Sequence, residues 1–416
     1  MAFRYCRHFP PRRTTTGGAI RHSEDNGDVV LVTGTTGNLG CYLLDALVSS
    51  SEVRLVYALN RASRDGASLL NRQKEALRHR GLDPQIPHSP KVILLEGSLT
   101  DPTWGLPVGV YEQVHRSTTH IIHNAWQVDM IARLPAFKSL LEGLRCLVDF
   151  ALTSPRTSPP RLLFTSSTAM LQYASRESPV LERPVKPEVT AACGYTKSKW
   201  VAEQILYAAA AQTDLDPLVV RVGQASGGKS GAWAVNEWYP LMAQSAAQLG
   251  CYPNDLRPIN FIPYEYAAAA LLDFRKASNA SHTVHLVHPD PTSWQTLARV
   301  IAREFGVPLV PFSEWVARLE AAAATLPQDT IDRRRRIRDL RVLQVMEWFQ
   351  DMLRVYYPAH MALGFPDVDM VEAMKASQTL ADPNLPRVSE EDVRRWLTYW
   401  RKVGLLGKCE QPLARL

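Results

Sequence analysis

The strongest constraint on the fold is a regular alternation of apolar and amphipathic segments that starts near residue 28. Strands that are apolar throughout, separated by helices, indicate a parallel sheet covered on both faces. Because crossovers between parallel strands are right-handed, the predicted fold is α/β and doubly wound. The predicted strands are residues 29–32, 53–59, 92–95, 120–123, 162–164 and 218–222, and the predicted helices include 39–48, 66–80, 137–152 and 195–211.

The alternation ends after about residue 223, and the rest of the chain has mainly helical patterns interrupted by prolines. We therefore expect a first domain over residues 28–224 and a smaller, mainly helical lobe over 225–416. One strand at 283–288 is expected to return to the main sheet. Residues 1–27 contain five arginines and no acid before Glu24, which predicts a disordered leader, with an organelle transit peptide as the alternative.

Composition and charge exclude several classes of protein. Of the 416 residues, 46% are hydrophobic and 21% charged, and no run approaches the roughly 18 apolar residues that span a bilayer. The six cysteines are scattered without CxxC spacing, which favours a reduced, cytoplasmic protein with no metal site. The net charge of +6 is concentrated at the N-terminus and in Arg333–Arg338. That run lacks the interleaved aromatic residues of a nucleic-acid platform, so we expect no nucleic-acid or membrane partner.

A glycine-rich turn, TGTTGNLG, lies between the first predicted strand and the first predicted helix. Such a turn lets the backbone approach a pyrophosphate, while amides at the helix N-terminus point at the anion. The strand and helix on either side are the context that a Rossmann dinucleotide site requires; the alternative is a structural turn only. The residues assigned to this part of the site are Gly34, Thr36, Gly37, Asn38, Leu39 and Gly40.

The second predicted strand ends in Ala58-Leu59-Asn60-Arg61. A site specific for NAD would carry Asp or Glu here to bind the ribose hydroxyls. Arg61 can instead form charge-assisted hydrogen bonds with a 2′-phosphate. The sequence therefore predicts NADPH as the cofactor, unless Arg61 is only a surface cation.

Tyr195 and Lys199 begin the helix that follows the fifth predicted strand. Residues four apart share one helix face, so the ammonium group can lie beside the phenol and lower its pKa. Such a tyrosine can donate a proton to an alkoxide as hydride arrives, and a neighbouring hydroxyl can stabilise the same oxygen. The candidate hydroxyls at the strand end are Thr165, Ser166, Ser167 and Thr168.

The glycine spacing and the Tyr195–Lys199 pair resemble those of the extended short-chain dehydrogenases, whose catalytic hydroxyl usually stands where Ser167 does. Longer stretches are similar to the thioester reductase domains of fungal adenylate-forming reductases, which end synthetases related to non-ribosomal peptide and polyketide synthases. The resemblance covers about residues 29–406, and the stretches that carry it are His120–Trp126, Arg221–Gln224, Asn236–Pro240, Ser293–Trp294 and Ser389–Trp396.

The resemblance implies a catalytic triad of Ser167, Tyr195 and Lys199, with the last two also touching the cofactor. It adds Ser98 and Leu99, which stand where an aspartate of the family usually contacts adenine. It further implies NADPH-dependent reduction of a carrier-bound or CoA acyl thioester to an aldehyde, or on to an alcohol, in secondary metabolism. The remaining implied cofactor contacts are Asn124 and Ala125.

The absence of an adenylation or carrier segment leads us to expect a free-standing reductase that acts in trans on a thioester made elsewhere, or a remnant of a larger synthetase. Two other functions stay open. The same triad serves reduction of a free ketone, aldehyde or acyl-CoA. A non-catalytic NADPH-binding regulator is the other alternative, against which the intact Tyr195 and Lys199 argue.

Overall fold

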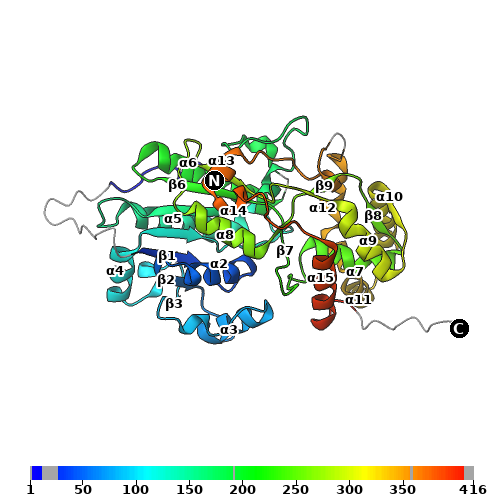
Figure 1. Cartoon of the computed structure of the whole chain (residues 1–416), viewed down its shortest axis with the longest axis horizontal. Helices are drawn as coiled ribbons and strands as arrows, with labels where there is room; N and C mark the ends of the chain where they lie inside the picture. The colour runs from blue at the N-terminus through cyan, green and yellow to red at the C-terminus, as the bar shows by residue number, and fades with distance from the viewer. Residues whose placement is uncertain (1, 12–26, 191–192, 357–358, 407–416) are drawn as a thin grey trace. The chain divides into compact units, whose positions relative to one another are not determined.

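The computed structural model describes residues 2–11, 27–190, 193–356 and 359–406 (Figure 1). The chain forms two compact units: unit 1 is Met1–Ala225, Asn260–Pro289 and Pro366–Pro386, and unit 2 is Ser226–Ile259, Asp290–Phe365 and Arg387–Leu416. The first boundary falls where the sequence predicted it. The sequence predicted that only a strand at 283–288 returns from the C-terminal lobe to the main sheet, whereas Asn260–Pro289 and Pro366–Pro386 both belong to unit 1.

Unit 1 is built on a seven-stranded sheet in the order β11-β6-β5-β4-β1-β2-β3, with every neighbouring pair parallel. This order confirms the predicted doubly wound fold and the predicted return of a late strand. The chain reverses direction across the sheet between β1 and β4, and ligands of such folds bind at the carboxyl ends of the strands there. The strands are β1 (Asp28–Thr33), β2 (Val53–Asn60), β3 (Val92–Glu96), β4 (His120–His123), β5 (Arg161–Ser167), β6 (Pro217–Val222) and β11 (Thr283–Leu286).

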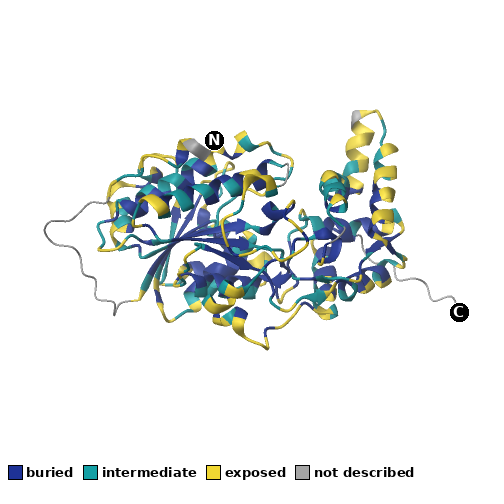
Figure 2. Ribbon diagram, turned by 90° about the horizontal axis from the view of Figure 1, so that it is seen from above, coloured by how far each residue is buried: buried dark blue, intermediate teal, exposed yellow. Residues whose placement is uncertain are grey.

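Both faces of this sheet are buried, because side chains of each strand alternate between them. Leu31, Leu59 and Phe164 pack with helices α5 (Lys138–Leu152) and α6 (Gly194–Gln212) in one apolar core. Val30 and Val32 flank Leu31 on β1, face the other side of the sheet and are also fully buried. Figure 2 shows the strands of this sheet buried along most of their length. The other helices of unit 1 are α2 (Asn38–Ser49), α3 (Leu69–His79), α4 (Val108–Ser117), α8 (Tyr264–Phe274), α13 (Val371–Ala376) and α14 (Gln378–Ala381).

The N-terminal residues pack on unit 1 instead of forming a free leader. Helix α1 (Ala2–Tyr5) places Tyr5 in the apolar core. The Arg145 guanidinium donates hydrogen bonds to the carbonyls of Tyr5, Arg7 and His8, and lies 4.4 Å from the centroid of the Phe9 ring. The prediction of a disordered leader is therefore wrong for residues 2–11, and residues 12–26 lie outside the described part.

Unit 2 is mainly helical and has an aromatic core in which Trp233, Tyr239, Trp294, Trp396 and Trp400 are buried. No helix in the described ranges is long and apolar enough to cross a membrane. The helices are α7 (Trp238–Leu249), α9 (Trp294–Phe305), α10 (Phe312–Ala324), α11 (Thr330–Asp339), α12 (Met346–Arg354) and α15 (Glu390–Lys402). The short strands are β8 (Tyr252–Asn254), β9 (Pro258–Ile259), β12 (Thr292–Ser293) and β13 (Leu309–Pro311), and the chain also has β7 (Ala225–Ser226) and β10 (Ile262–Pro263).

One buried carboxylate fastens the late segment 366–386 to the sheet of unit 1. Glu182 accepts hydrogen bonds from the backbone N–H groups of His285 in β11 and of Glu372 and Ala373 in α13. Burial raises the pKa of Glu182 from 4.5 to about 7, although these hydrogen bonds oppose the shift.

This raised pKa predicts a specific pH dependence of stability. A protonated Glu182 is favoured in the folded state, so its contribution is complete below about pH 4.5 and is lost as the pH rises to about 7. The slope is at most about 1.4 kcal/mol per pH unit. We expect the free energy of unfolding of wild type, minus that of Glu182→Gln, to decrease between about pH 4.5 and pH 7. Urea unfolding of both proteins measures this difference, and a constant difference would contradict the assignment.

Candidate active site

The glycine turn after β1 is so tight that Gly34 and Gly40 have no room for a side chain. Gly34 has φ +77°, and a Cβ built on it would lie 2.9 Å from the Cα of Ala125. A Cβ on Gly40 would collide with the carbonyl oxygen of Gly34. Alanine at either position would force this turn, helix α2 and the end of β4 apart. The turn predicted from the sequence is therefore formed, and its glycines are required by the close packing of the turn against Ala125 and against itself.

A network of hydrogen bonds, which the sequence did not predict, holds this turn against the end of β2 and helix α3. The side-chain oxygen of Asn60 accepts hydrogen bonds from the amide and the hydroxyl of Thr36, both at 3.3 Å. The Asn60 amide donates to Thr35 Oγ1 (2.8 Å), which donates in turn to Gln73 Oε1 (2.7 Å). Asn60 was visible in the sequence only as the neighbour of Arg61. Its role depends on the pairing of β2 with β1.

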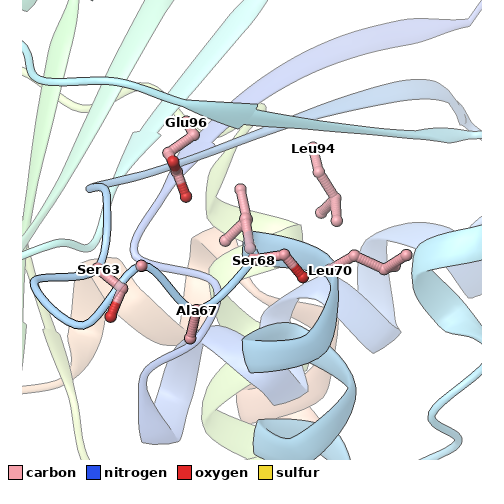
Figure 3. A pocket seen from close by; sticks show the side chains of 8 residues that line it. Ser63, Ala67, Ser68, Leu70, Leu94 and Glu96 are labelled. Carbon is pink, nitrogen blue, oxygen red and sulfur yellow. The ribbon is translucent and has the colours of Figure 1, made fainter.

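Arg61 lies at the carboxyl end of β2 with an exposed side chain. Its carbonyl accepts a hydrogen bond from Arg72, whose guanidinium also pairs with the Glu96 carboxylate at 2.8 Å. Glu96 also lines a pocket of about 310 Å³ beside the loop that follows Arg61. Figure 3 shows the Glu96 side chain among the lining residues. The pocket is lined by Ser63, Gly66, Ala67, Ser68, Leu69, Leu70, Leu94 and Glu96.

The end of β4 lies directly against the glycine turn. Asn124 donates a hydrogen bond to the carbonyl of Gly34 (3.4 Å), and the amide of Ala125 donates to Thr33 Oγ1 (3.0 Å). The same hydroxyl is 2.8 Å from Nδ1 of His123. Burial, aided by the charge of Lys199, lowers the pKa of His123 to about 3, so the imidazole is neutral here. Asn124 and Ala125 thus lie against the glycine turn, and their predicted contact with the cofactor stays a prediction.

Three of the predicted cofactor residues have side chains engaged by the protein itself. The Asn38 side chain accepts a hydrogen bond from Arg80 (2.5 Å), and Ser98 Oγ is 3.1 Å from Thr100 Oγ1. Leu99 packs toward α5, where a Cβ on Gly143 would be 3.2 Å from the Leu99 Cβ. Contacts of Ser98 and Leu99 with adenine therefore stay predictions.

The predicted pair Tyr195 and Lys199 is buried at the start of α6. The Lys199 ammonium donates a hydrogen bond to the carbonyl of Thr165 at the end of β5. It lies 5.9 Å from the centroid of the Tyr195 ring, with the rings of Phe164 and Trp126 at 4.6 and 4.7 Å. Burial lowers the pKa of Lys199 well below its usual value, and the Glu203 carboxylate opposes this shift. The geometry places the cation beside the phenol.

The hydroxyl groups at the end of β5 have different hydrogen-bond partners. Thr165 donates to the carbonyl of His123, and Ser166 donates to Glu203. Ser167 instead accepts a hydrogen bond from the amide of Ala169 (3.2 Å) and is only partly buried. Because alternate residues of a strand face opposite sides, Ser167 shares the face of Thr165 and not that of Ser166. These contacts favour Ser167 as the hydroxyl that stabilises the substrate oxygen.

Comparison with known proteins places this site in a family. Residues 32–271 match the family described as male sterility protein, an NAD-binding family. The chain is 40% identical over 413 residues to the adenylate-forming reductase Nps10 of Heterobasidion annosum, covering 97% of this chain and 37% of that protein. The chain thus spans little more than a third of the length of this curated relative.

Solved structures share the fold at low sequence identity. The terminal R domain of the myxalamid PKS–NRPS pathway is 22% identical with a TM-score of 0.73, covering 97% of this chain and 95% of that one. An archaeal thiolation–reductase di-domain of a non-ribosomal peptide synthetase is 18% identical with a TM-score of 0.69, covering 91% of this chain and 77% of that one.

These findings confirm the resemblance to reductase domains that the sequence motifs indicated. The family match covers the glycine turn, Arg61, the ends of β4 and β5, and the Tyr195–Lys199 pair. The chain therefore belongs to the NAD-binding family described as male sterility protein, and over nearly its whole length it is similar to an adenylate-forming reductase.

Proposed function

We propose that this domain uses NADPH to reduce an acyl thioester held on a carrier protein, and that the product is released as an aldehyde. The observation that carries the proposal is the buried site at the carboxyl end of β5, where Lys199 lies beside Tyr195 and Ser167 closes the strand. Two features of the similar proteins support the substrate class: the relatives are named as reductases, and one solved structure joins its reductase domain to a thiolation domain.

The side chains of this site can steady the oxygen of the reacting carbonyl. NADPH, when bound, supplies the hydride that adds to the thioester carbon. Ser167 and Tyr195 would donate hydrogen bonds to the oxygen as negative charge develops on it, and Tyr195 would transfer its proton there. Lys199 would keep the phenol acidic. The C–S bond of the resulting hemithioacetal then breaks as its hydroxyl gives up a proton and the sulfur gains one, which gives an aldehyde and a free thiol.

The choice of NADPH over NADH is proposed from the end of β2. Arg61 is exposed there, and the nearby Glu96 carboxylate is neutralised by Arg72. A 2′-phosphate would therefore meet cationic side chains instead of the acid that holds a ribose of NAD. The residues of the turn that would hold the pyrophosphate are Gly34 and Gly37–Gly40, with Asn124 and Ala125 beside them.

The function is tested with the purified protein, NADPH and a matched set of substrates. The set contains one acyl group as a carrier-bound thioester, as a short pantetheine thioester, as the CoA thioester, as the free acid and as the aldehyde. Loss of nicotinamide absorbance with the thioesters and formation of the aldehyde are expected. Turnover of free ketones or aldehydes alone would replace the proposal with a general carbonyl reductase, and NADPH binding without any turnover would indicate a regulator.

Replacement of the proposed proton donor is expected to separate chemistry from binding. Tyr195→Phe should lower turnover by at least about 100-fold, as loss of a general acid does, while NADPH binding stays close to normal. Lys199→Ala should weaken both, because the lysine is assigned to the cofactor as well as to the phenol. Steady-state rates and cofactor fluorescence titrations measure these effects. A Tyr195→Phe protein that keeps most of its activity would require another proton donor.

Cofactor choice is expected to depend on Arg61. Arg61→Ala should weaken NADPH binding by about 1.5–3 kcal/mol, as for a lost charged hydrogen bond, and leave NADH binding nearly unchanged. Arg54→Ala is the matched control, because Arg54 is also exposed on β2 but lies near its opposite end. Equal losses for both cofactors in the Arg61 variant would show that Arg61 does not bind the 2′-phosphate.

The arginines of α11 are proposed to attract an acidic carrier protein. Arg333–Arg336 and Arg338 are exposed and form no ion pair with any residue in the described ranges. Arg334, Arg335 and Arg338 share one face with Ile331, which is 75% exposed. Complementary charge raises the rate of encounter, and salt weakens this effect. The alternative is a solvated helix face.

Neutralising this face is expected to affect only the carrier-bound substrate. The triple variant Arg334→Gln, Arg335→Gln, Arg338→Gln should lower kcat/KM for the carrier thioester several-fold at low ionic strength, and leave the short pantetheine thioester unaffected. A control with the same change in charge replaces the exposed Arg116, Arg299 and Arg303. If the triple variant reduced both substrates with the same kinetics as wild type, α11 would be a solvated helix face and not a docking surface.

A further inference from the structure

A fully buried ion pair lies one helical turn beyond Lys199. Glu203 on α6 and Arg221 on β6 both have side chains with no solvent exposure. The guanidinium binds the carboxylate with two hydrogen bonds, Nη2 to Oε2 at 2.8 Å and Nε to Oε1 at 3.1 Å. Arg221 is the one charged residue of a strand that is otherwise apolar, PLVVRV. A charge in such a strand requires a buried partner, and α6 supplies it.

The same carboxylate joins α6, β5 and β6 directly, and it is connected to β11 through Tyr207. Ser166 on β5 donates to Glu203 Oε1 at 2.5 Å, and the Tyr207 hydroxyl donates to Oε2 at 3.2 Å. Tyr207 is also 2.7 Å from the hydroxyl of Thr283 on β11. Ser166 directly precedes Ser167, and Glu203 is on the helix that carries Tyr195 and Lys199. The ion pair therefore links both segments that supply the triad.

Stability alone does not explain this arrangement. Removing two charges from water costs several kcal/mol per ion, and well-packed apolar residues of similar volume are often as stable or more so. The position of the pair suggests a role at the site instead. Because Glu203 is four residues from Lys199 on α6, its negative charge acts on the same helix face as the ammonium group.

Several charged and titratable groups surround Lys199, and Glu203 is the one that raises its pKa. Tyr195 lies on the same helix, the neutral His123 on β4, and Arg221 on β6 behind Glu203. Burial lowers the pKa of Lys199, while Glu203 raises it. Burial also lowers the pKa of Arg221, but the Glu203 carboxylate outweighs burial, and Arg221 stays charged.

We propose that Glu203, held by Arg221, is a positioning residue of the active site that keeps Lys199 charged and fixes α6 against the end of β5. The proposal rests on the function proposed above, since it assumes that a charged Lys199 acts on Tyr195. The ion pair thus acts on the reacting groups through Lys199 and Ser166, without touching substrate.

The test replaces the carboxylate with an amide and follows two titrations. In Glu203→Gln, Lys199 loses its proton at lower pH, so the basic limb of the kcat/KM profile should move down by about one pH unit. The phenolate absorbance of Tyr195, taken as the difference from Tyr195→Phe in each background, should move up by about one unit, because the neighbouring cation is gone when the phenol ionises. A purely structural role would move neither titration.

Control variants separate this effect from loss of folding. Glu182→Gln removes another buried carboxylate of unit 1, and both titrations should stay in place. Glu203→Asp should restore part of the wild-type profile. Should Glu203→Gln fail to fold, the double variant Glu203→Gln, Arg221→Met removes both buried charges, and the same two shifts are expected in it. The proposal would be overturned if the single or the double variant folded and neither the basic limb of kcat/KM nor the Tyr195 titration moved. Since the Tyr195 titration needs no substrate, it tests the ion pair even where the wild type reduces no thioester.

Discussion

The parallel sheet of unit 1 is buried on both faces, and the rest of the site depends on this burial. Strands such as β1 and β6 carry no side chain to solvent along most of their length. Polar chemistry is therefore restricted to the ends of the strands, where loops leave the apolar layers. The glycine turn, Asn60, Asn124 and Ser167 all lie at or just beyond carboxyl ends, at the edge where the strand order reverses. One hydrophobic constraint thus gathers residues that are more than a hundred positions apart.

Burial also sets the electrostatics of the site. An ammonium group at the position of Lys199 is costly, because it lies among Phe164, Trp126 and the Tyr195 ring with almost no water. The structure offsets this cost with the Thr165 carbonyl, the faces of the aromatic rings and the Glu203 carboxylate. His123, in the same surroundings, is neutral. A charged Lys199 beside the phenol would favour the ionised form of Tyr195, which is what proton donation to substrate requires.

The two units differ in how they are held together. Unit 1 contains the fully buried ion pair Glu203–Arg221 and the buried Glu182, which connect segments far apart in the chain. The core of unit 2 is aromatic, with Trp233 stacked on Tyr239 at 5.0 Å. Helix α15 of unit 2 begins with a capping box between Ser389 and Asp392, which is a local device readable from the sequence. In the arginine-rich α11 of the same unit, residues 331–336, 338 and 339 are exposed.

The sequence by itself determined the elements that obey local rules. The strands and helices of unit 1, the glycine turn and the Tyr195–Lys199 helix follow from apolar periodicity and from spacing along one segment, and the structure has them with ends shifted by a few residues. The structure alone decided which distant residues meet. Asn60 supports the turn, Ser166 and Ser167 face opposite sides, and Arg145 holds residues 5–9, so that the predicted leader is ordered there. The return of segments 260–289 and 366–386 to unit 1 was likewise invisible, except for one strand. Local pattern records which face of an element is apolar, whereas partners of buried polar groups depend on the pairing of strands and the packing of helices, which no single segment encodes.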